Sequence, residues 1–413
     1  MKIVVQKFGG TSVATPQLRE MVADRIEEAR EEDCGVVVVV SAMGRTGDPY
    51  ATDTLKNLAL KVCPDSTLRE LDLIMSCGEI ISSVVMANTL QARGIPARAM
   101  TGFQAGMLTD EEFSQAEVSS CKPDKILEVL QGGEVVIAAG FQGISENKEI
   151  TTLGRGGSDT SAVILGAALN AEKVEIFTDV SGVMTADPKL LEEARIIDHL
   201  TYSEVCHMAY EGAKVIHPSA VEIAMQHNVS LVIKNPAESG RGTLINNEYS
   251  EQKGFHKRKR IITGIAHADD LVQLKVKLPP DGSISELDLF QQLADAKISI
   301  DMITVFPEVK VFSIQQPLLA KGEKLLKEMK VDYEVIKGCA KVSVIGVAMR
   351  NIPGVMAQVV KALNQQEIKI LQTGDSNISI SLLMEEKDLK RAIKALHDHF
   401  ELGKVKEIPA ETF

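Results

Sequence analysis

Short apolar runs alternate with helical patterns from residue 1 to about residue 245, and this alternation limits the possible folds most strongly. Residues 36–40 are five consecutive valines, which is typical of a strand buried on both faces of a sheet. Further strands are predicted at 134–139, 174–177 and 231–233, with helices such as 158–169 and 202–210 between them. The pattern predicts an α/β sandwich with a mainly parallel central sheet over residues 1–245.

The composition turns polar and basic at residues 246–262, where we predict a linker. Two similar units follow at 263–338 and 339–413, each with the predicted order βαββαβ. The first is expected to end on a strand at 331–336 and the second to begin on a strand at 341–347. The last strand, at 405–408, is expected either to complete the second unit or to pair back onto the first.

Size, charge and cysteine content exclude several classes of protein. At 413 residues the chain is long enough for two or three domains, and its net charge of −12 argues against nucleic-acid binding. No run of 18 apolar residues predicts a membrane span, and the N-terminus enters a strand directly, without a signal peptide. The six cysteines are scattered without a C-x-x-C pair, so we expect a cytoplasmic protein with reduced thiols and no metal site.

A first glycine turn follows the predicted strand at 3–5. Gly9 and Gly10 allow backbone N–H groups to approach a ligand closely, and Lys7 supplies a compact positive charge beside them. The spacing matches neither the P-loop nor the dinucleotide fingerprint. Strand, glycine turn, lysine and a following helix predict a phosphate cradle, although an ordinary turn has the same local pattern.

A second glycine loop occupies 154–160, at the start of the predicted helix 158–169. Three glycines in four residues free several N–H groups for an anion. Arg155 offers a planar fork that fits a carboxylate, and Asp159 can accept from an ammonium group. The loop predicts a site for a zwitterionic amino acid, with a flexible turn carrying a surface Arg–Asp pair as the alternative.

Other candidate residues lie near the ends of predicted strands. Ser41 follows the valine strand, at the edge where α/β sheets bind ligands. Glu79 could hold an ammonium group, although an ordinary glutamate in the first turn of a helix starting at 76–79 is the simpler interpretation. The loop at 178–189, which contains Lys189, and Lys214 suit a nucleotide, although either of these two lysines alone is more often a surface residue. His217, which precedes a proline, is interpreted as structural.

Five segments, taken in order, resemble the aspartate kinases of the amino acid kinase family. They are residues 7–13, 41–44, 152–160, 178–188 and 212–218. The resemblance covers essentially the whole chain, and the two C-terminal units resemble the paired ACT domains of that family, which bind amino-acid effectors. No reductase domain follows residue 413, so the resemblance is to the monofunctional members.

The resemblance implies ATP-dependent phosphorylation of the L-aspartate side chain to 4-phospho-L-aspartate, the first step toward lysine, threonine, methionine and diaminopimelate. It implies Mg²⁺ held mainly by phosphates and water. Lys7 and Asp159 would be catalytic. The implied ATP residues are Lys7, Gly9, Gly10, Thr11, Thr178, Asp179, Asp187, Lys189 and Lys214. The implied aspartate pocket comprises Ser41, Thr52, Glu79, Phe141, Arg155, Gly156, Ser158 and Asp159.

The resemblance also implies feedback regulation and a homodimer paired through the ACT units. The implied effector residues are Asp281, Asp301, Pro353, Gly354, Gln372 and Thr373. The pattern is nearest to relatives inhibited by diaminopimelate, and lysine and threonine remain open as effectors.

Three departures from the family pattern affect these assignments. A longer segment at 45–51 leaves the substrate contact open between Thr46 and Thr52. Lys189 stands where the family has arginine, which keeps the charge but loses the fork. Residues 283–284 are Ser-Ile where a proline–glycine pair is usual, so effector binding at the first unit is expected to be altered.

Two other functions remain open at this point. The same fold could phosphorylate a different acidic amino acid, such as glutamate. The chain could also be a non-catalytic amino-acid sensor built on the ACT-like units. The presence of all four charged residues of the implied site, Lys7, Arg155, Asp159 and Lys214, argues against a decayed active site.

Overall fold

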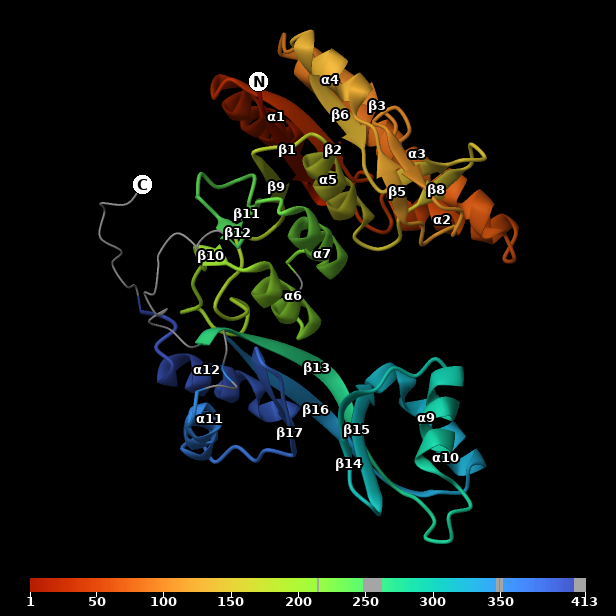
Figure 1. Ribbon diagram of the computed structural model, residues 1–413, viewed down its shortest axis with the longest axis vertical. Helices are drawn as coiled ribbons and strands as arrows, with labels where there is room; N and C mark the ends of the chain where they lie inside the picture. The colour runs from red at the N-terminus through yellow and green to blue at the C-terminus, as the bar shows by residue number, and fades with distance from the viewer. Residues whose placement is uncertain (214, 248–261, 347–348, 350–351, 405–413) are drawn as a thin grey trace. The chain divides into compact units, whose positions relative to one another are not determined.

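The computed structural model describes residues 1–213, 215–247, 262–346, 349 and 352–404 (Figure 1). They form two compact units. The first comprises Met1–Val183, Ile196–Ala209 and Lys214–His256, and the second comprises Met184–Arg195, Tyr210–Ala213 and Lys257–Phe413. Lys214, most of the predicted linker and the predicted strand at 405–408 lie outside the described residues.

The first unit is built on an eight-stranded sheet in the order β10-β12-β11-β9-β1-β2-β6-β3. The strands are β1 (Lys2–Phe8), β2 (Cys34–Val40), β3 (Ala97–Met100), β6 (Val135–Ala139), β9 (Lys173–Phe177), β10 (His199–Leu200), β11 (Leu231–Lys234) and β12 (Thr243–Ile245). Every neighbouring pair is parallel except β11 and β12. The prediction of a mainly parallel sheet, with the valine run buried at its centre, is confirmed.

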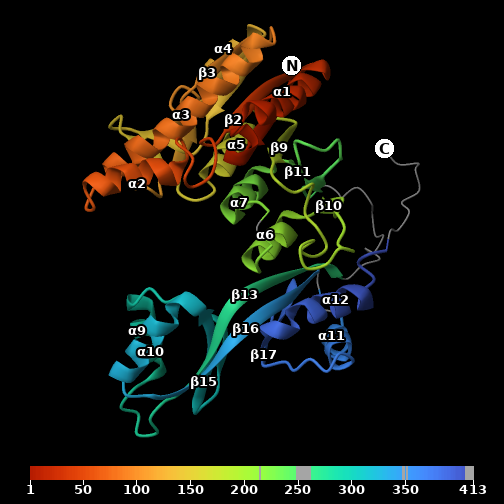
Figure 2. The same cartoon turned by 180° about the vertical axis from the view of Figure 1, so that it is seen from behind.

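Helices cover both faces of this sheet (Figures 1 and 2). One face, with Val36, Val38 and Val40, packs against α1 (Pro16–Glu31) and α3 (Leu68–Ala92). On the other face, α5 (Gly157–Ala168) contacts β1, β2 and β9. Further helices of this unit are α2 (Thr52–Val62), α4 (Asp124–Gln131), α6 (Tyr202–Tyr210) and α7 (Pro218–His227), and a 3-10 turn, η1, spans Gly10–Val13.

The long helix α3 belongs to the core of the first unit. By length and composition it is one helix that could cross a membrane, but half of its most apolar window is buried inside the protein. It packs against a small sheet, β5-β4-β7-β8, through β8. The strands of that sheet are β4 (Met107–Thr109), β5 (Val118–Cys121), β7 (Gln142–Ser145) and β8 (Ile150–Thr152). The prediction of a helix start at 76–79 is wrong, because the Thr67 side chain caps the helix from Leu68 onward.

Four adjacent parallel strands, β9, β1, β2 and β6, end at one edge of the large sheet. The glycine turn follows β1, Ser41 follows β2, Phe141 follows β6 by two residues, and Thr178 follows β9. Because the carboxyl ends of parallel strands meet at one edge, segments far apart in the sequence come together there.

The second unit contains a six-stranded sheet in the order β14-β15-β13-β16-β18-β17. Its strands are β13 (Ile262–Lys277), β14 (Asp301–Val305), β15 (Val309–Gln315), β16 (Asp332–Gly346), β17 (Gln372–Asp375) and β18 (Ser379–Glu385). The helices are α9 (Glu286–Asp295), α10 (Leu319–Glu328), α11 (Val355–Asn364) and α12 (Leu389–His399), with 3-10 turns η2 (Gln316–Leu318) and η4 (Glu386–Asp388). Each half of the sheet has its own apolar core.

Two long strands, β13 and β16, run through both halves of this sheet. Residues 271–277 of β13 pair with β15, whereas residues 262–268 pair with the second half of β16. The strands predicted at 331–336 and 341–347 are therefore one strand, and the predicted boundary at 338/339 falls inside it. A register shift between Ala268 and Leu271 and a positive φ of 65° at Gly338 interrupt the regular ladder between the halves.

Two short segments of the predicted catalytic domain pack in the second unit instead. Ala186, Leu191 and Ala194 share an apolar core with residues of β16 and β18. Glu211 pairs with Lys341 of β16, with 3.0 Å between the carboxylate and the ammonium nitrogen. The two units are therefore interleaved along the sequence, which the composition shift near residue 246 does not reveal.

Candidate active site

A cavity of about 1180 Å³ lies in the first unit at the carboxyl edge of the large sheet. Its walls come from the end of β1, the segments after β2 and β6, the chain around 114–118, the second glycine loop, and the helices α2, α3, α5 and α7. Gly9, Gly10 and Thr11, which follow β1, are not in the cavity lining. Of the predicted residues, the lining includes Lys7, Ser41, Thr52, Glu79, Phe141, Arg155, Gly156, Ser158 and Asp159. The predicted catalytic pair and the predicted aspartate pocket therefore share one cavity.

Lys7 and Asp159 form an ion pair in this cavity. The Lys7 ammonium nitrogen lies 2.7 Å from Asp159 Oδ1, and both side chains are 13% exposed. Lys7 is on β1, and Asp159 is in the first turn of α5, so the pair joins the two glycine segments. A Cβ built on Gly9 would lie 3.8 Å from the Lys7 ammonium, which places this charge directly over the glycine turn.

The first glycine turn is locked to the loop after β2. The Gly44 N–H donates to the Gly10 carbonyl at 2.9 Å. A Cβ on Gly10 would lie 2.2 Å from the Ala42 carbonyl oxygen, so no larger residue fits there without moving the backbone. This close approach gives Gly10 a packing role in addition to the predicted phosphate cradle.

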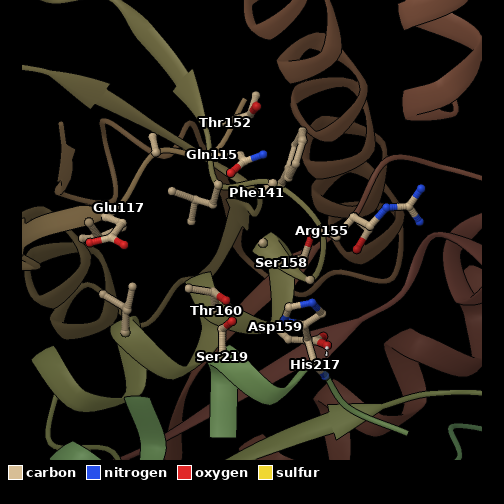
Figure 3. A pocket seen from close by; sticks show the side chains of 18 of the residues that line it. Gln115, Glu117, Phe141, Thr152, Arg155, Ser158, Asp159, Thr160, His217 and Ser219 are labelled. Carbon is tan, nitrogen blue, oxygen red and sulfur yellow. Dashed lines mark hydrogen bonds between the residues drawn. The ribbon is translucent and has the colours of Figure 1, made fainter. Parts of the chain in front are cut away.

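The second glycine loop is fixed by residues on both sides. Gly156 has a φ of +76°, and a Cβ on it would lie 2.2 Å from Cγ of the His217 ring. A Cβ on Gly157 would lie 2.8 Å from the Phe141 ring. The His217 N–H also donates to Asp159 Oδ2 at 3.5 Å, as the close-up in Figure 3 shows. His217 therefore supports both the loop and the Asp159 carboxylate, in line with its structural interpretation.

Replacing Gly156 by alanine is expected to lower kcat at least about tenfold, because His217 must move and Asp159 loses its support. Gly133→Ala is the matched control: Gly133 has a similar φ of +79°, but nothing lies within 4 Å of a Cβ there. Both variants should lose about 1–2 kcal/mol of stability from the left-handed backbone. Steady-state kinetics and thermal unfolding separate the effects, and equal kcat values in the two variants would contradict this role.

Phe141 has a strained backbone. Its φ is +68°, in the left-handed region that bulky side chains rarely adopt. The strain is held by two hydrogen bonds: the Phe141 N–H donates to Ser161 Oγ at 3.0 Å, and its carbonyl accepts from Leu153 N at 2.9 Å. Such strain is concentrated at functional sites, and here it aims the ring at the glycine loop.

Glu79 is a buried carboxyl group in the wall of the cavity. It is 2% exposed, and its Oε1 accepts a hydrogen bond from the Ala42 N–H at 3.1 Å. Burial raises the pKa of Glu79 to about 8, although the Ala42 N–H partly opposes this shift. Within the described part of the chain, its Oε2 has no hydrogen-bond partner. A buried acceptor without a partner is available to a cationic ligand group.

The matches to known proteins agree with this geometry. Residues 2–235 match the model of the amino acid kinase family, and residues 342–400 match an ACT domain model. Aspartokinase 1 of Bacillus subtilis is 45% identical over 98% of this chain and 100% of its own length. The chain belongs to the aspartokinases of the amino acid kinase family. This membership confirms the family predicted from the sequence, the kinase class and the ACT fold after residue 342.

Solved structures of aspartokinases share the fold. The crystal structure of aspartate kinase from Synechocystis is 33% identical, covers 100% of this chain and 71% of its own, and has a TM-score of 0.54. E. coli aspartokinase III in complex with aspartate and ADP is 24% identical, covers 96% and 99% of the two chains, and has a TM-score of 0.74.

The sequence left open whether Thr46 or Thr52 contacts the substrate, and the aspartokinase fold places these two residues differently. Thr52 lines the cavity at the start of α2. Thr46 is outside the lining, and its hydroxyl donates to Asp53 Oδ2 at 2.7 Å. The geometry therefore favours Thr52 as the substrate contact.

Other predicted residues lie outside the cavity or away from its centre. Arg155 is exposed, and Figure 3 shows its guanidinium directed away from Asp159. Thr178 and Asp179 are not in the cavity lining, and their side chains hydrogen-bond to each other at 3.2 Å. Asp187 and Lys189 belong to the second unit, and Lys214 is outside the described residues.

The predicted effector residues are spread over the second unit. Asp281 is on an exposed loop, where the Ser283 N–H holds its pKa below the usual range. Asp301 pairs with the buried Lys341, at 2.5 Å between carboxylate and ammonium. Gln372 donates to Thr304 Oγ1 at 2.9 Å, and the Thr373 side chain is exposed on the same strand, β17.

The two predicted helix starts of the ACT-like units differ. Gly354, after Pro353, precedes α11 with a φ of +92°. α9 begins without such a glycine, because Ser285 and Asp288 form a capping box: the Asp288 N–H donates to Ser285 Oγ at 3.2 Å. The capping box replaces the missing proline–glycine pair as a helix start.

Several residues of the cavity wall were not singled out from the sequence, among them Ser114, Gln115 and Thr152. Ser114 and Gln115 belong to a loop at 110–117, and Thr152 ends β8. The loop at 110–117 carries no glycine cluster and no Arg–Asp pair that would indicate a site, and Thr152 lies two residues before the second glycine loop. Asp72, on α3, accepts hydrogen bonds from Ser114 and Thr152 and also lacks a sequence signal.

Proposed function

We propose that this chain uses ATP to phosphorylate the side-chain carboxylate of L-aspartate, which gives 4-phospho-L-aspartate. The observation that carries the proposal is the Lys7–Asp159 pair, which joins two glycine segments in the cavity that also contains Glu79. The full-length match to aspartokinases supports the same reaction. Phosphorylation of another acidic amino acid and a purely sensory role are the outcomes against which it is tested.

The acceptor needs no general base, because an aspartate carboxylate is already ionised near neutral pH. The protein then has to align the two reactants and stabilise the charge on the transferring phosphoryl group. Lys7, over the glycine turn, meets this need. Asp159 holds the Lys7 ammonium in place before the nucleotide enters.

ATP is expected to bind along the edge formed by Gly9, Gly10, Thr11, Thr178 and Asp179. The first glycine turn suits a phosphate group, since Gly9 and Gly10 carry no side chains that would shield their backbone N–H groups. Asp187, Lys189 and Lys214 are the other residues for which the family resemblance implies nucleotide contacts. Mg²⁺ would be held mainly by phosphate oxygens and water, and it would neutralise charge on the transferring group.

Aspartate is expected to bind between Glu79 and the second glycine loop. Its ammonium group suits the unpartnered oxygen of Glu79, and Arg155 can reach its α-carboxylate after a side-chain rotation. Ser41, Thr52, Phe141, Gly156 and Ser158 form the rest of this pocket. The depth from Arg155 to Glu79 would then decide which acidic amino acid fits.

An ADP-release assay with a panel of acceptors tests this function. We expect turnover with L-aspartate, and a value of kcat/KM for L-glutamate lower by at least about 100-fold, because an extra methylene displaces the reacting carboxylate. A preference for glutamate would favour the second enzymatic function. No turnover with any acidic amino acid would favour the sensor.

We also propose that the second unit binds an amino-acid effector and pairs with a second copy of the chain in the cytoplasm. Ile303, Val305 and Phe306 are each about half exposed on or beside the edge strand β14, which suits an apolar interface. Diaminopimelate, lysine and threonine are the effectors to add to the same assay. A mass measurement in solution that gives a monomer would contradict the pairing.

A further inference from the structure

A buried carboxylate behind the cavity has no role in the scheme above. Asp72 lies on α3 two turns before Glu79, and its side chain is 0% exposed. Residues seven apart share one face of a helix, so α3 directs two buried carboxylates toward the same wall. No ion pair with Asp72 occurs among the residues that the structure describes, so four hydrogen bonds alone compensate its burial.

These four hydrogen bonds come from two segments of the cavity wall. Asp72 Oδ2 accepts from the backbone N–H groups of Ser114 and Thr152, both at 2.8 Å. Asp72 Oδ1 accepts from the Ser114 hydroxyl at 2.9 Å and from the Thr152 hydroxyl at 2.8 Å. One carboxylate therefore joins the loop at 110–117 to the end of β8.

The same contacts continue into the second glycine loop. The Ala116 N–H donates to the Thr152 carbonyl at 2.9 Å, which ties the two segments directly. A Cβ built on Gly154 would lie 3.1 Å from the Ser114 carbonyl oxygen, so the start of the glycine loop rests on Ser114. Ser114 itself has a φ of +69°, a conformation that needs such support.

We propose that Asp72 is a positioning residue for acceptor binding: it holds the loop at 110–117 and the second glycine loop against the helix that carries Glu79. The inference rests on the proposed kinase function. Thr152 and Gln115 lie on the cavity wall in Figure 3, close to Phe141 and above Arg155 and Ser158. Release of this wall would change the depth of the aspartate pocket, whereas the first glycine turn is held separately by the loop after β2.

Steady-state kinetics with two Asp72 variants test the proposal. Asp72→Ala leaves two buried N–H groups without partners and should raise KM for aspartate at least about tenfold, with KM for ATP changed less than about threefold. Asp72→Asn should remain within about threefold of wild type, because its amide oxygen can accept from both N–H groups while its NH₂ donates to both hydroxyls. Thermal unfolding of each variant shows whether it is folded.

The control is Asp110→Asn, in the same loop. Asp110 Oδ1 accepts from Glu112 N at 3.2 Å and from Glu117 N at 3.1 Å, at the exposed end of the loop. This variant should leave both KM values unchanged. Equal rises of both KM values in Asp72→Ala would indicate a general structural role, and an Asn variant as impaired as the Ala variant would show that charge is what matters. Either result would overturn the proposal.

Hydrogen exchange of the wild-type protein provides a test that no folding defect can obscure. The Ser114 amide should exchange slowly without ligand, since it is tied to a buried carboxylate, while the Glu112 amide, which donates to the exposed Asp110 side chain, should exchange fast. A Ser114 amide that exchanges as fast as the Glu112 amide would refute the positioning role of Asp72. This result does not depend on which acceptor the enzyme uses. It therefore separates failure of the positioning role of Asp72 from failure of the proposed reaction.

Discussion

Replacing Lys7 by alanine is expected to lower kcat by at least about 100-fold, the usual loss when one contact to a transition-state charge is removed. The Lys7 ammonium lies over the glycine turn and 2.7 Å from Asp159, so it is already placed where the phosphoryl charge would develop. KM for aspartate should change much less, because Lys7 acts on the phosphate. The ADP-release assay measures both constants.

Lys2→Ala is the matched control for this prediction. Lys2 is on the same strand but at its other end, where it forms an exposed ion pair with Glu172 at 3.2 Å. An exposed pair of this kind contributes little to stability and should not affect turnover. A Lys7→Ala enzyme with nearly wild-type kcat would exclude the proposed role of Lys7.

The second large effect is expected from Glu79→Gln, which should remove a pH dependence of aspartate binding. Burial raises the pKa of Glu79 to about 8, so the free enzyme has a neutral carboxyl group there at neutral pH. Binding of an ammonium group favours the ionised form. The wild-type kcat/KM for aspartate should therefore rise with pH up to about 8, and the variant should be flat in this range and lower by at least about tenfold.

The same group gives a stability test with a defined sign. Between pH 4.5, the unperturbed pKa, and about 8, folded Glu79 keeps a proton that the unfolded chain has released. The free energy of unfolding should therefore fall as pH rises through this window, and Glu79→Gln should lack this contribution. Glu70→Gln is the control, because Glu70 is exposed on the same helix and pairs with Arg69. Identical pH dependence in wild type and Glu79→Gln would contradict the account of Glu79.

The central part of the first unit could be predicted from the sequence because its signals are local. The valine run gives the buried strand, and the two glycine segments follow strands or open a helix. Since parallel strands end at one edge, the convergence of Lys7 and Asp159 follows from the order of the segments. The tight approaches at Gly10 and Gly156 give physical reasons for glycine that the sequence only suggests.

Other features depend on contacts between distant residues and leave no local signal. Asp72 is an acidic residue within a helical pattern, and only the fold shows its four partners. The segment at Met184–Arg195 lies within the predicted catalytic domain, yet its apolar side chains complete a core of the second unit. The strand β13 begins at Ile262, the last residue of the predicted linker, and pairs there with Gly346, far along the chain on β16.

Lys7 and the first glycine turn are expected to hold the terminal phosphate of ATP against the carboxylate of bound aspartate. A crystal structure of the enzyme with aspartate, Mg²⁺ and a non-hydrolysable ATP analogue tests this most directly. The terminal phosphate should lie within hydrogen-bond distance of the Lys7 ammonium and of the N–H groups of Gly9 or Gly10, with aspartate beside Glu79. A terminal phosphate bound away from both Lys7 and this turn would contradict this expectation.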